Sequence, residues 1–250
     1  LRFTLIKLSS LGRLMLYGKE TKKALENFTI SGITMPTDFI RSLAMIKRAC
    51  AIANEKEGKL EAALAKAIRS ATRDIIKGKY DDEFVLDVFQ TGSGTSTNMN
   101  MNEVLSELCQ IKYGEKVHPN DHVNKAQSTN DTFPTAMHIA IAIQANKKLI
   151  PAISLLEKAL AKKTKEFKDI VKIGRTHLQD ATPLTLGQEF SGYHMQVSKS
   201  LTRIKRALLE IYPLAQGGTA VGTGINSRKG WDKTIAAEIK KITKLPFHTA

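Results

Sequence analysis

The sequence contains little cysteine, few aromatic residues and no long apolar run. Only two cysteines, Cys50 and Cys109, occur among 250 residues, and neither has a Cys-x-x-Cys neighbour. This count favours free thiols in a reducing compartment over a disulfide framework, so we expect a cytoplasmic protein. Hydrophobic residues make up 42% of the chain and charged residues 25%. The chain can therefore bury a sizeable core, and disordered and collagen-like classes are excluded.

No membrane-spanning helix is predicted. An apolar-rich stretch without Lys or Arg, residues 126–146, is interrupted by polar side chains such as Asp131 and His138, so we expect a soluble protein. Residues 1–16 are largely apolar, but they lack an unbroken apolar core and a cleavage site of small residues. These absences argue against a signal peptide, and we interpret the segment as a short strand and loop.

Acidic residues are outnumbered by basic ones. Lys and Arg total 38 against 24 Asp and Glu, a formal net charge of +14 at pH 7. Nucleic acid, an anionic membrane surface and small anionic substrates are all attracted by such a field. Residues 1–125 carry 19 basic and 15 acidic side chains, whereas residues 126–250 carry 19 and 9. The basic residues there are interleaved with apolar helix positions, and no aromatic-rich basic motif occurs, which favours a small dianion over nucleic acid.

Apolar side chains recur every three to four residues through most of the chain. This pattern predicts one helix from Thr37, as its N-cap, to a stop at Gly58, and a second helix that ends near Gly78. Longer patterns follow, one opened by Pro134 and one over residues 190–208. Long helices with few convincing strands predict an all-α fold without βαβ units.

Four polar blocks separate these helices. They read TGSGTSTNMNMN at 91–102, HPNDHVNKAQSTND at 118–131, GRTHLQDATP at 174–183 and GGTAVGTGIN at 217–226. The first is too polar for a core, and it precedes a helix expected to begin near Met101, whose N-terminal N–H groups favour anions. Singly, each block is typical of a loop or a helix cap. Together they supply the hydroxyls and amides that hold carboxylates through several hydrogen bonds.

One histidine pair and one single histidine are candidates for chemistry. His118 and His122 are four residues apart, a spacing of metal ligands, but Pro119 and the residues after it predict a turn, so we expect no metal site. His177 lies in a loop-like block and is the better candidate for proton transfer, because imidazole titrates near neutral pH. A purely structural role for a single histidine stays open.

Segments of the four blocks stand in a distinctive order. They are TGSGT at 91–95, NMNMNE at 98–103, VHPND at 117–121, QSTND at 127–131 and GRTHLQDA at 174–181. In this order they resemble the motifs of the fumarase and aspartase superfamily, and specifically of class II fumarases. The resemblance runs from about residue 17 to 250. It implies a long-helix bundle, with a mainly helical N-terminal domain at residues 1–127 and a central helical-bundle domain at residues 128–250 that is incomplete at its C-terminal end.

The resemblance implies a hydro-lyase of the tricarboxylic acid cycle, which adds water reversibly to fumarate to give L-malate and needs no metal or organic cofactor. Removing a proton next to a carboxylate leaves an aci-carboxylate, whose extra charge must be held by preorganised donors. By resemblance, His177 acts as acid in dehydration and base in hydration. The residues expected by resemblance to bind the substrate carboxylates are Ser93, Gly94, Thr95, Ser128, Thr129, Asn130 and Thr176.

His177 also separates related activities. An aspartase is expected to carry Gln at this position, so His177 favours hydration, while an aspartase-like ammonia lyase and a basic helical nucleic-acid-binding protein stay as alternatives. By resemblance, a second dicarboxylate-binding stretch lies near the entrance of the site. It consists of His118, Pro119, Asn120 and Asp121.

The resemblance further implies a homotetramer in which each active site draws motifs from three chains, with no nucleic acid or membrane as partner. The apolar pattern at residues 190–208 is consistent with a partner helix, from this chain or another. The Ser-Ser-x-Met-Pro-x-Lys-x-Asn loop of the family, which carries the carbon-side base, does not occur in residues 1–250. We therefore expect a truncated chain that is inactive by itself. Residues before Tyr17 match the family poorly.

Overall fold

The structure is a computed structural model that describes residues 15–250. Most of the strand and loop expected at residues 1–16 lies outside the described residues. The helical elements are α1 (Lys19–Asn27), α2 (Thr37–Lys56), α3 (Ala62–Ile76), η1 (Asp81–Glu83), α4 (Thr95–Tyr113), η2 (Pro119–Val123), α5 (Thr129–Gln144), η3 (Ala145–Leu149), α6 (Ile150–Glu166), α7 (Leu186–Ala207), η4 (Leu208–Glu210) and α8 (Trp231–Thr243). The strands are β1 (Val171–Thr176), β2 (Gln179–Thr185), β3 (Pro213–Leu214) and β4 (His248–Thr249). The predicted all-α class is confirmed.

The chain divides into two compact units. Unit 1 comprises the described residues up to Ala140 together with Tyr212–Ala250, and unit 2 comprises Ile141–Ile211. The two units are defined by the contacts that residues make within this one chain. The domain boundary expected between residues 127 and 128 stays a prediction.

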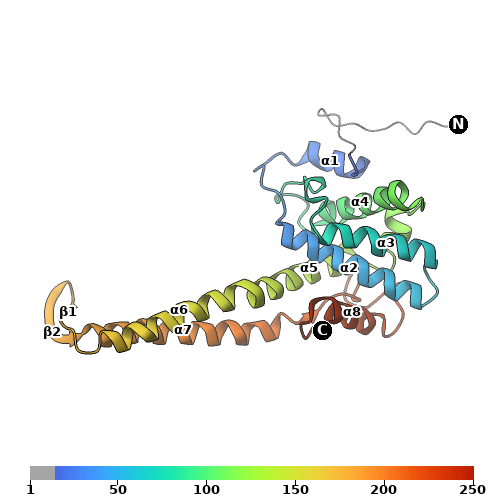
Figure 1. Cartoon of the computed structure of the whole chain (residues 1–250). Helices are drawn as coiled ribbons and strands as arrows, with labels where there is room; N and C mark the ends of the chain where they lie inside the picture. The colour runs from blue at the N-terminus through green and yellow to red at the C-terminus, as the bar shows by residue number, and fades with distance from the viewer. Residues whose placement is uncertain (1–14) are drawn as a thin grey trace. The chain divides into compact units, whose positions relative to one another are not determined.

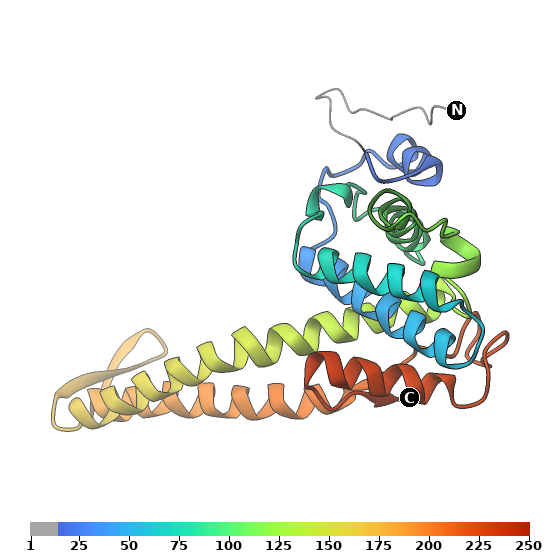
Figure 2. The ribbon, with the colours of Figure 1, turned by 45° about the vertical axis from the view of Figure 1, so that its right-hand side comes forward.

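The core of unit 1 is built on α2, which packs against α3 and α8; Figure 2 shows α2 alongside α3. Leu43, Ile46 and Cys50 of α2 are fully buried. Trp231 at the start of α8 is also fully buried, and its Nε1–H donates to Asn54 Oδ1 of α2 at 3.0 Å. A buried indole needs such an acceptor, so this bond fixes where α8 docks.

The ends of α2 are close to those predicted. Thr37 is the first helical residue rather than the N-cap, a position that Pro36 occupies. Gly58 has a φ of +69° and follows the last turn, as a helix stop requires. The difference at Thr37 has a physical cause, because the carbonyl oxygen of Pro36 already accepts the first helical N–H groups, from Phe39 at 2.9 Å and Ile40 at 3.2 Å.

Two expectations about the first polar block are wrong. The helix expected near Met101 begins at Thr95, directly after Gly94, which takes a left-handed conformation. The block is also not excluded from the core, since Asn98, Asn100 and Asn102 are 3% exposed or less. Polar side chains can be buried when they find partners, and Asn100 Nδ2 donates to the carbonyl oxygen of Glu83 at 3.1 Å.

The long helix expected from Pro134 begins five residues earlier, at Thr129. Ser128 provides the cap, because its Oγ accepts the N–H of Asn130 at 3.2 Å. Pro134 therefore lies inside α5. The sequence prediction favoured the proline because it usually opens helices, and it missed the serine cap.

Unit 2 is a helical hairpin. Figure 1 shows α6 and α7 side by side, with β1 and β2 at one end. The antiparallel pairing of β1 with β2 converts the third polar block, expected as a loop, into a β-hairpin. Gly187 allows the start of α7 to lie close to α6, since a Cβ at this position would lie 2.6 Å from the carbonyl oxygen of Thr164 in α6.

One helical segment, Thr129–Glu166, is long and apolar enough to cross a membrane by length and hydropathy alone. This finding differs from the sequence prediction, which ended the apolar stretch at Lys147 and Lys148, whereas the helix continues through both. Only 17% of its most apolar window is buried in this chain. Most of this window therefore lacks cover from the described residues.

Candidate functional site

The N-terminus of α4 carries the first group of predicted binding residues. Ser93 and Thr95 are exposed, and their hydroxyl oxygens lie 2.9 Å apart. Between them, Gly94 has a φ of +74°, and a Cβ at this position would lie 2.2 Å from the ring of Phe133 in α5. Glycine is thus required both for the backbone turn and for the contact with α5.

The N-terminus of α5 carries the second group. Asn98 of α4 donates through Nδ2 to Thr129 Oγ1 at 3.0 Å and to Asn124 Oδ1 at 3.1 Å. Together with the contact between Gly94 and Phe133, these bonds bring the two helix N-termini together. Backbone N–H groups at such ends have no intrahelical partners, so the arrangement suits an anion.

Asp131 connects this site to the fourth polar block. Its carboxylate is 2% exposed and accepts from the N–H groups of Ser128 at 3.0 Å, Gly217 at 3.0 Å and Thr219 at 2.9 Å. Asn130 Nδ2 donates to the carbonyl oxygen of Ala220 at 2.8 Å. Sequence reasoning included Asp131 only as part of a motif and missed this role. An acidic residue in the first turn of a helix was the available signal.

Lys47 is a second residue that sequence reasoning missed. It is fully buried on α2, and its Nζ donates to Asn124 Oδ1 and to Gln127 Oε1, both at 2.9 Å. Burial lowers the pKa of Lys47 to about 7, while nearby Cys50 and Asp131 raise it. The available signal was a basic residue directly after Ile46 on the apolar face of α2.

The predicted second dicarboxylate stretch lies in unit 1 around η2. The expected turn is present, with His118 as the N-cap, its Nδ1 accepting from the N–H of Asp121 at 3.1 Å. His118 and Asp121 are exposed, and their side chains lie within ion-pair distance, 3.0 Å. Within residues 15–250, no group of three or more His, Cys, Asp or Glu side chains is placed to hold a metal ion.

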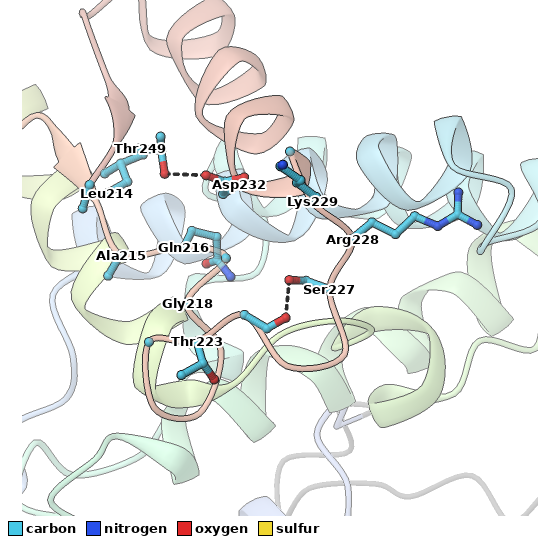
Figure 3. Close-up of a pocket in the computed structure, with 15 residues that line it drawn as sticks. Leu214, Ala215, Gln216, Gly218, Thr223, Ser227, Arg228, Lys229, Asp232 and Thr249 are labelled. Atoms are coloured by element: carbon cyan, nitrogen blue, oxygen red, sulfur yellow. Dashed lines mark hydrogen bonds between the residues drawn. The ribbon is translucent and has the colours of Figure 1, made fainter.

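The fourth polar block borders a cavity of ≈ 590 Å³ (Figure 3). Gln216 lines it and is 2% exposed, while Arg228 and Lys229 add positive charge. Thr249 Oγ1 donates to Asp232 Oδ2 at 2.8 Å on its wall. None of the residues expected to bind substrate lines this cavity. The cavity is nevertheless linked to the N-terminus of α5 through Gly217, which lines the cavity and donates its N–H to Asp131.

Thr176 and His177 belong to unit 2. Both are exposed at the turn between β1 and β2, where His177 has a φ of +46° and Leu178 a φ of +61°. The arms of the turn are joined by an ion pair between Arg175 and Asp180 at 3.0 Å. The structure thus places six of the seven predicted substrate-binding residues in unit 1, whereas Thr176 and the predicted catalytic His177 belong to unit 2.

Comparison with known proteins identifies the family. A family model described as "Lyase" matches residues 13–250. The chain belongs to this lyase family. It is 54% identical to the mitochondrial fumarate hydratase of Dictyostelium discoideum over 243 residues, covering 94% of this chain and 50% of that protein. It is 55% identical to the class II fumarate hydratase of Rickettsia bellii, covering 94% of this chain and 52% of that protein.

A solved structure agrees with these similarities. This chain matches the crystal structure of class II fumarase from Schistosoma mansoni with a TM-score of 0.88 and 44% identity. The match covers 95% of this chain and 52% of that chain. The resemblance to class II fumarases is therefore confirmed. The chain spans about half the length of the curated relatives it matches.

Proposed function

We propose that the whole protein to which this chain belongs is a class II fumarate hydratase, a hydro-lyase of the tricarboxylic acid cycle that interconverts fumarate and L-malate. The observation that carries the proposal is the meeting of two helix N-termini, α4 and α5, which bear hydroxyl and amide side chains. Identity above 50% to fumarate hydratases over 94% of the chain supports it.

The two N-termini are suited to a dicarboxylate. Ser93, Thr95, Ser128, Thr129 and Asn130 offer neutral donors, and the helix dipoles add positive potential. Such preorganised donors hold the negative charge that develops on a carboxylate when a proton leaves the neighbouring carbon. The proposed role of Gly94 is to let the backbone turn and approach.

Thr176 and His177 are proposed to complete the site. Thr176 donates to a substrate carboxylate, and His177 exchanges a proton with the hydroxyl or water. The proposed second dicarboxylate site at His118–Asp121 holds a ligand near the entrance and takes no part in the chemistry. No metal or organic cofactor is included in the proposed mechanism.

The proposed assembly is a homotetramer with active sites shared between subunits. Leu155 of α6 is 71% exposed and Met195 of α7 is 51% exposed, so the helical hairpin of unit 2 retains an apolar face. Burying such a face against helices of other subunits gains roughly 25 cal/mol per Å². The proposal assigns this face, including the apolar part of Thr129–Glu166, to other subunits rather than to a membrane.

The proposed location is the cytoplasm. The relatives include mitochondrial enzymes from Dictyostelium discoideum and Homo sapiens and a bacterial class II enzyme. The two buried free cysteines are compatible with any reducing compartment.

The test follows fumarate absorbance with the whole protein, using L-malate or L-aspartate as substrate. We expect turnover of malate and none of aspartate, and faster turnover of aspartate would favour the aspartase alternative. His177→Asn is expected to lower kcat by about 10²-fold or more, the usual scale for losing a positioned acid or base. His118→Asn is the matched control and is expected to change kcat much less. Near-normal kcat in His177→Asn would leave His177 with a structural role only.

A further inference from the structure

Beneath the N-terminus of α5 lies a lysine whose hydrogen bonds go to neutral amides. Lys47 is fully buried, and its Nζ donates to Asn124 and Gln127 at 2.9 Å each. Both acceptors lie on the loop that leads into Ser128. A buried cation that is not hydrogen-bonded to a carboxylate is costly, and an apolar residue would often serve packing equally well. A role beyond packing is therefore required to explain this arrangement.

The lysine determines which way the neighbouring amides point. An ammonium group can only donate, so the atom of Asn124 that it contacts must be the amide oxygen. Asn98 lies 3.1 Å from this same oxygen, so Asn98 must approach it with its Nδ2. The amide assignment thus follows from the charged form of Lys47. The bond from Asn124 Nδ2 to the carbonyl oxygen of Gln127 at 3.4 Å agrees with it.

The same Nδ2 of Asn98 donates to Thr129 Oγ1 at 3.0 Å. A hydroxyl that accepts from an amide keeps its own hydrogen for another acceptor. Thr129 is only partly buried at the start of α5. Its O–H is consequently available to donate to an anion at the N-terminus of the helix.

We propose that Lys47 is a positioning residue, which through Asn124 and Asn98 keeps the Thr129 hydroxyl as a donor to the substrate carboxylate. This inference rests on the proposed function. Without Lys47, the Asn124 amide is held in this orientation only by the long bond from its Nδ2 to the carbonyl oxygen of Gln127 at 3.4 Å. If the amide reverses, Asn98 follows, and Thr129 donates inward to Asn98 instead of outward. A second consequence is that the charged form of Lys47 and a bound dianion stabilise each other, with Asp131 of α5 and Cys50 of α2 as the neighbouring titratable groups.

The experiment is a double-mutant cycle in the whole protein with Lys47→Met and Thr129→Val. Losing a hydrogen bond to a charged group is expected to raise KM for L-malate about 10-fold or more in each single variant, with kcat changed much less. Because Lys47 acts through Thr129, Lys47→Met is expected to add no further rise in KM when Thr129 is already Val. Lys56→Met is the matched control on α2, since Lys56 is exposed and pairs with Glu238 at 2.9 Å. It is expected to leave KM unchanged.

The inference would be overturned if Lys47→Met leaves KM unchanged. It would also be overturned if the rise in KM of the double variant equals the product of the rises in the two single variants. If Lys47→Met does not fold, Asn98→Leu is the second variant, because it removes the bonds from Asn98 to Asn124 and Thr129 but keeps Lys47. Asn98→Leu must raise KM in the protein with Thr129 and must not raise it further in the Thr129→Val protein. The wild-type protein reports on the proposed function separately. If it turns over aspartate rather than malate, the proposed function fails, and the same cycle run with aspartate still decides the role of Lys47.

Discussion

Replacing Gly94 by Ala tests whether the two helix N-termini must meet as the structure has them. The added Cβ would lie 2.2, 2.3 and 2.8 Å from three carbons of the Phe133 ring. That ring packs against Phe39, with centroids 4.6 Å apart, and Phe39 is buried, so it has little room to move. The φ of +74° adds backbone strain, because alanine rarely adopts this conformation.

The two effects have known scales. A left-handed conformation costs a non-glycine residue about 1–2 kcal/mol, and overpacking a close contact costs about 1–3 kcal/mol. Their sum predicts a loss of about 2–5 kcal/mol in the free energy of unfolding. Because Ser93 and Thr95 flank the glycine, a shift of α4 away from α5 is expected to raise KM for the dicarboxylate as well.

The assay compares thermal unfolding and KM of the whole protein carrying Gly94→Ala with those of Gly92→Ala. Gly92 is the matched control, since nothing lies within 4 Å of its Cβ position. We expect the melting temperature to fall by several degrees only in Gly94→Ala. Equal stability and equal KM in the two variants would refute the close contact between α4 and α5.

Three further predictions concern buried charges. Asp131→Asn is expected to cost about 1–3 kcal/mol in a thermal melt, because an amide NH₂ meets backbone donors, whereas the exposed Asp121→Asn is expected to be neutral. The pKa of Lys47 is about 7 in the folded protein against an ordinary 10.5, so the unfolded chain holds the proton more tightly. Unfolding free energy is therefore expected to rise by about 1 kcal/mol per pH unit between pH ~7 and pH ~10.5, a slope that Lys47→Met removes. Glu103→Ala is expected to speed hydrogen exchange in α1, because its carboxylate accepts the N–H groups of Gly18, Glu20 and Thr21; unchanged exchange there would contradict this.

Local patterns predicted much of the fold. The stripe on α2 and the stop at Gly58 could be read because periodicity and a helix-ending glycine are local signals. The start of α4 at Thr95 was missed, since a polar block next to glycines is typical of loops and only tertiary partners reveal its burial. The strands of the third block were missed for a similar reason. The pairing of β1 with β2 involves the segments that α6 and α7 bring together, and the local sequence does not report this.

For the candidate site, the sequence pointed to candidate residues but not to the groups that hold them in place. Motif order pointed to Ser128 and Thr129, whose hydroxyls lie in one stretch of sequence. The groups that hold them come from distant positions, such as Gly217 bonding to Asp131 across 86 residues. Lys47 likewise reaches Asn124 across 77 residues. Periodicity reports which face of a helix is buried, but it carries no information about which distant polar group that face will meet.

The turn at the tip of β1 and β2 limits which amino acids can stand there. His177 and Leu178 both have positive φ, a region that asparagine, aspartate, histidine and glycine tolerate and that β-branched residues avoid. A natural variant with valine or isoleucine at position 177 would disturb the hairpin itself. Loss of activity in such a variant would say little about proton transfer, whereas an asparagine variant keeps the backbone and isolates the imidazole.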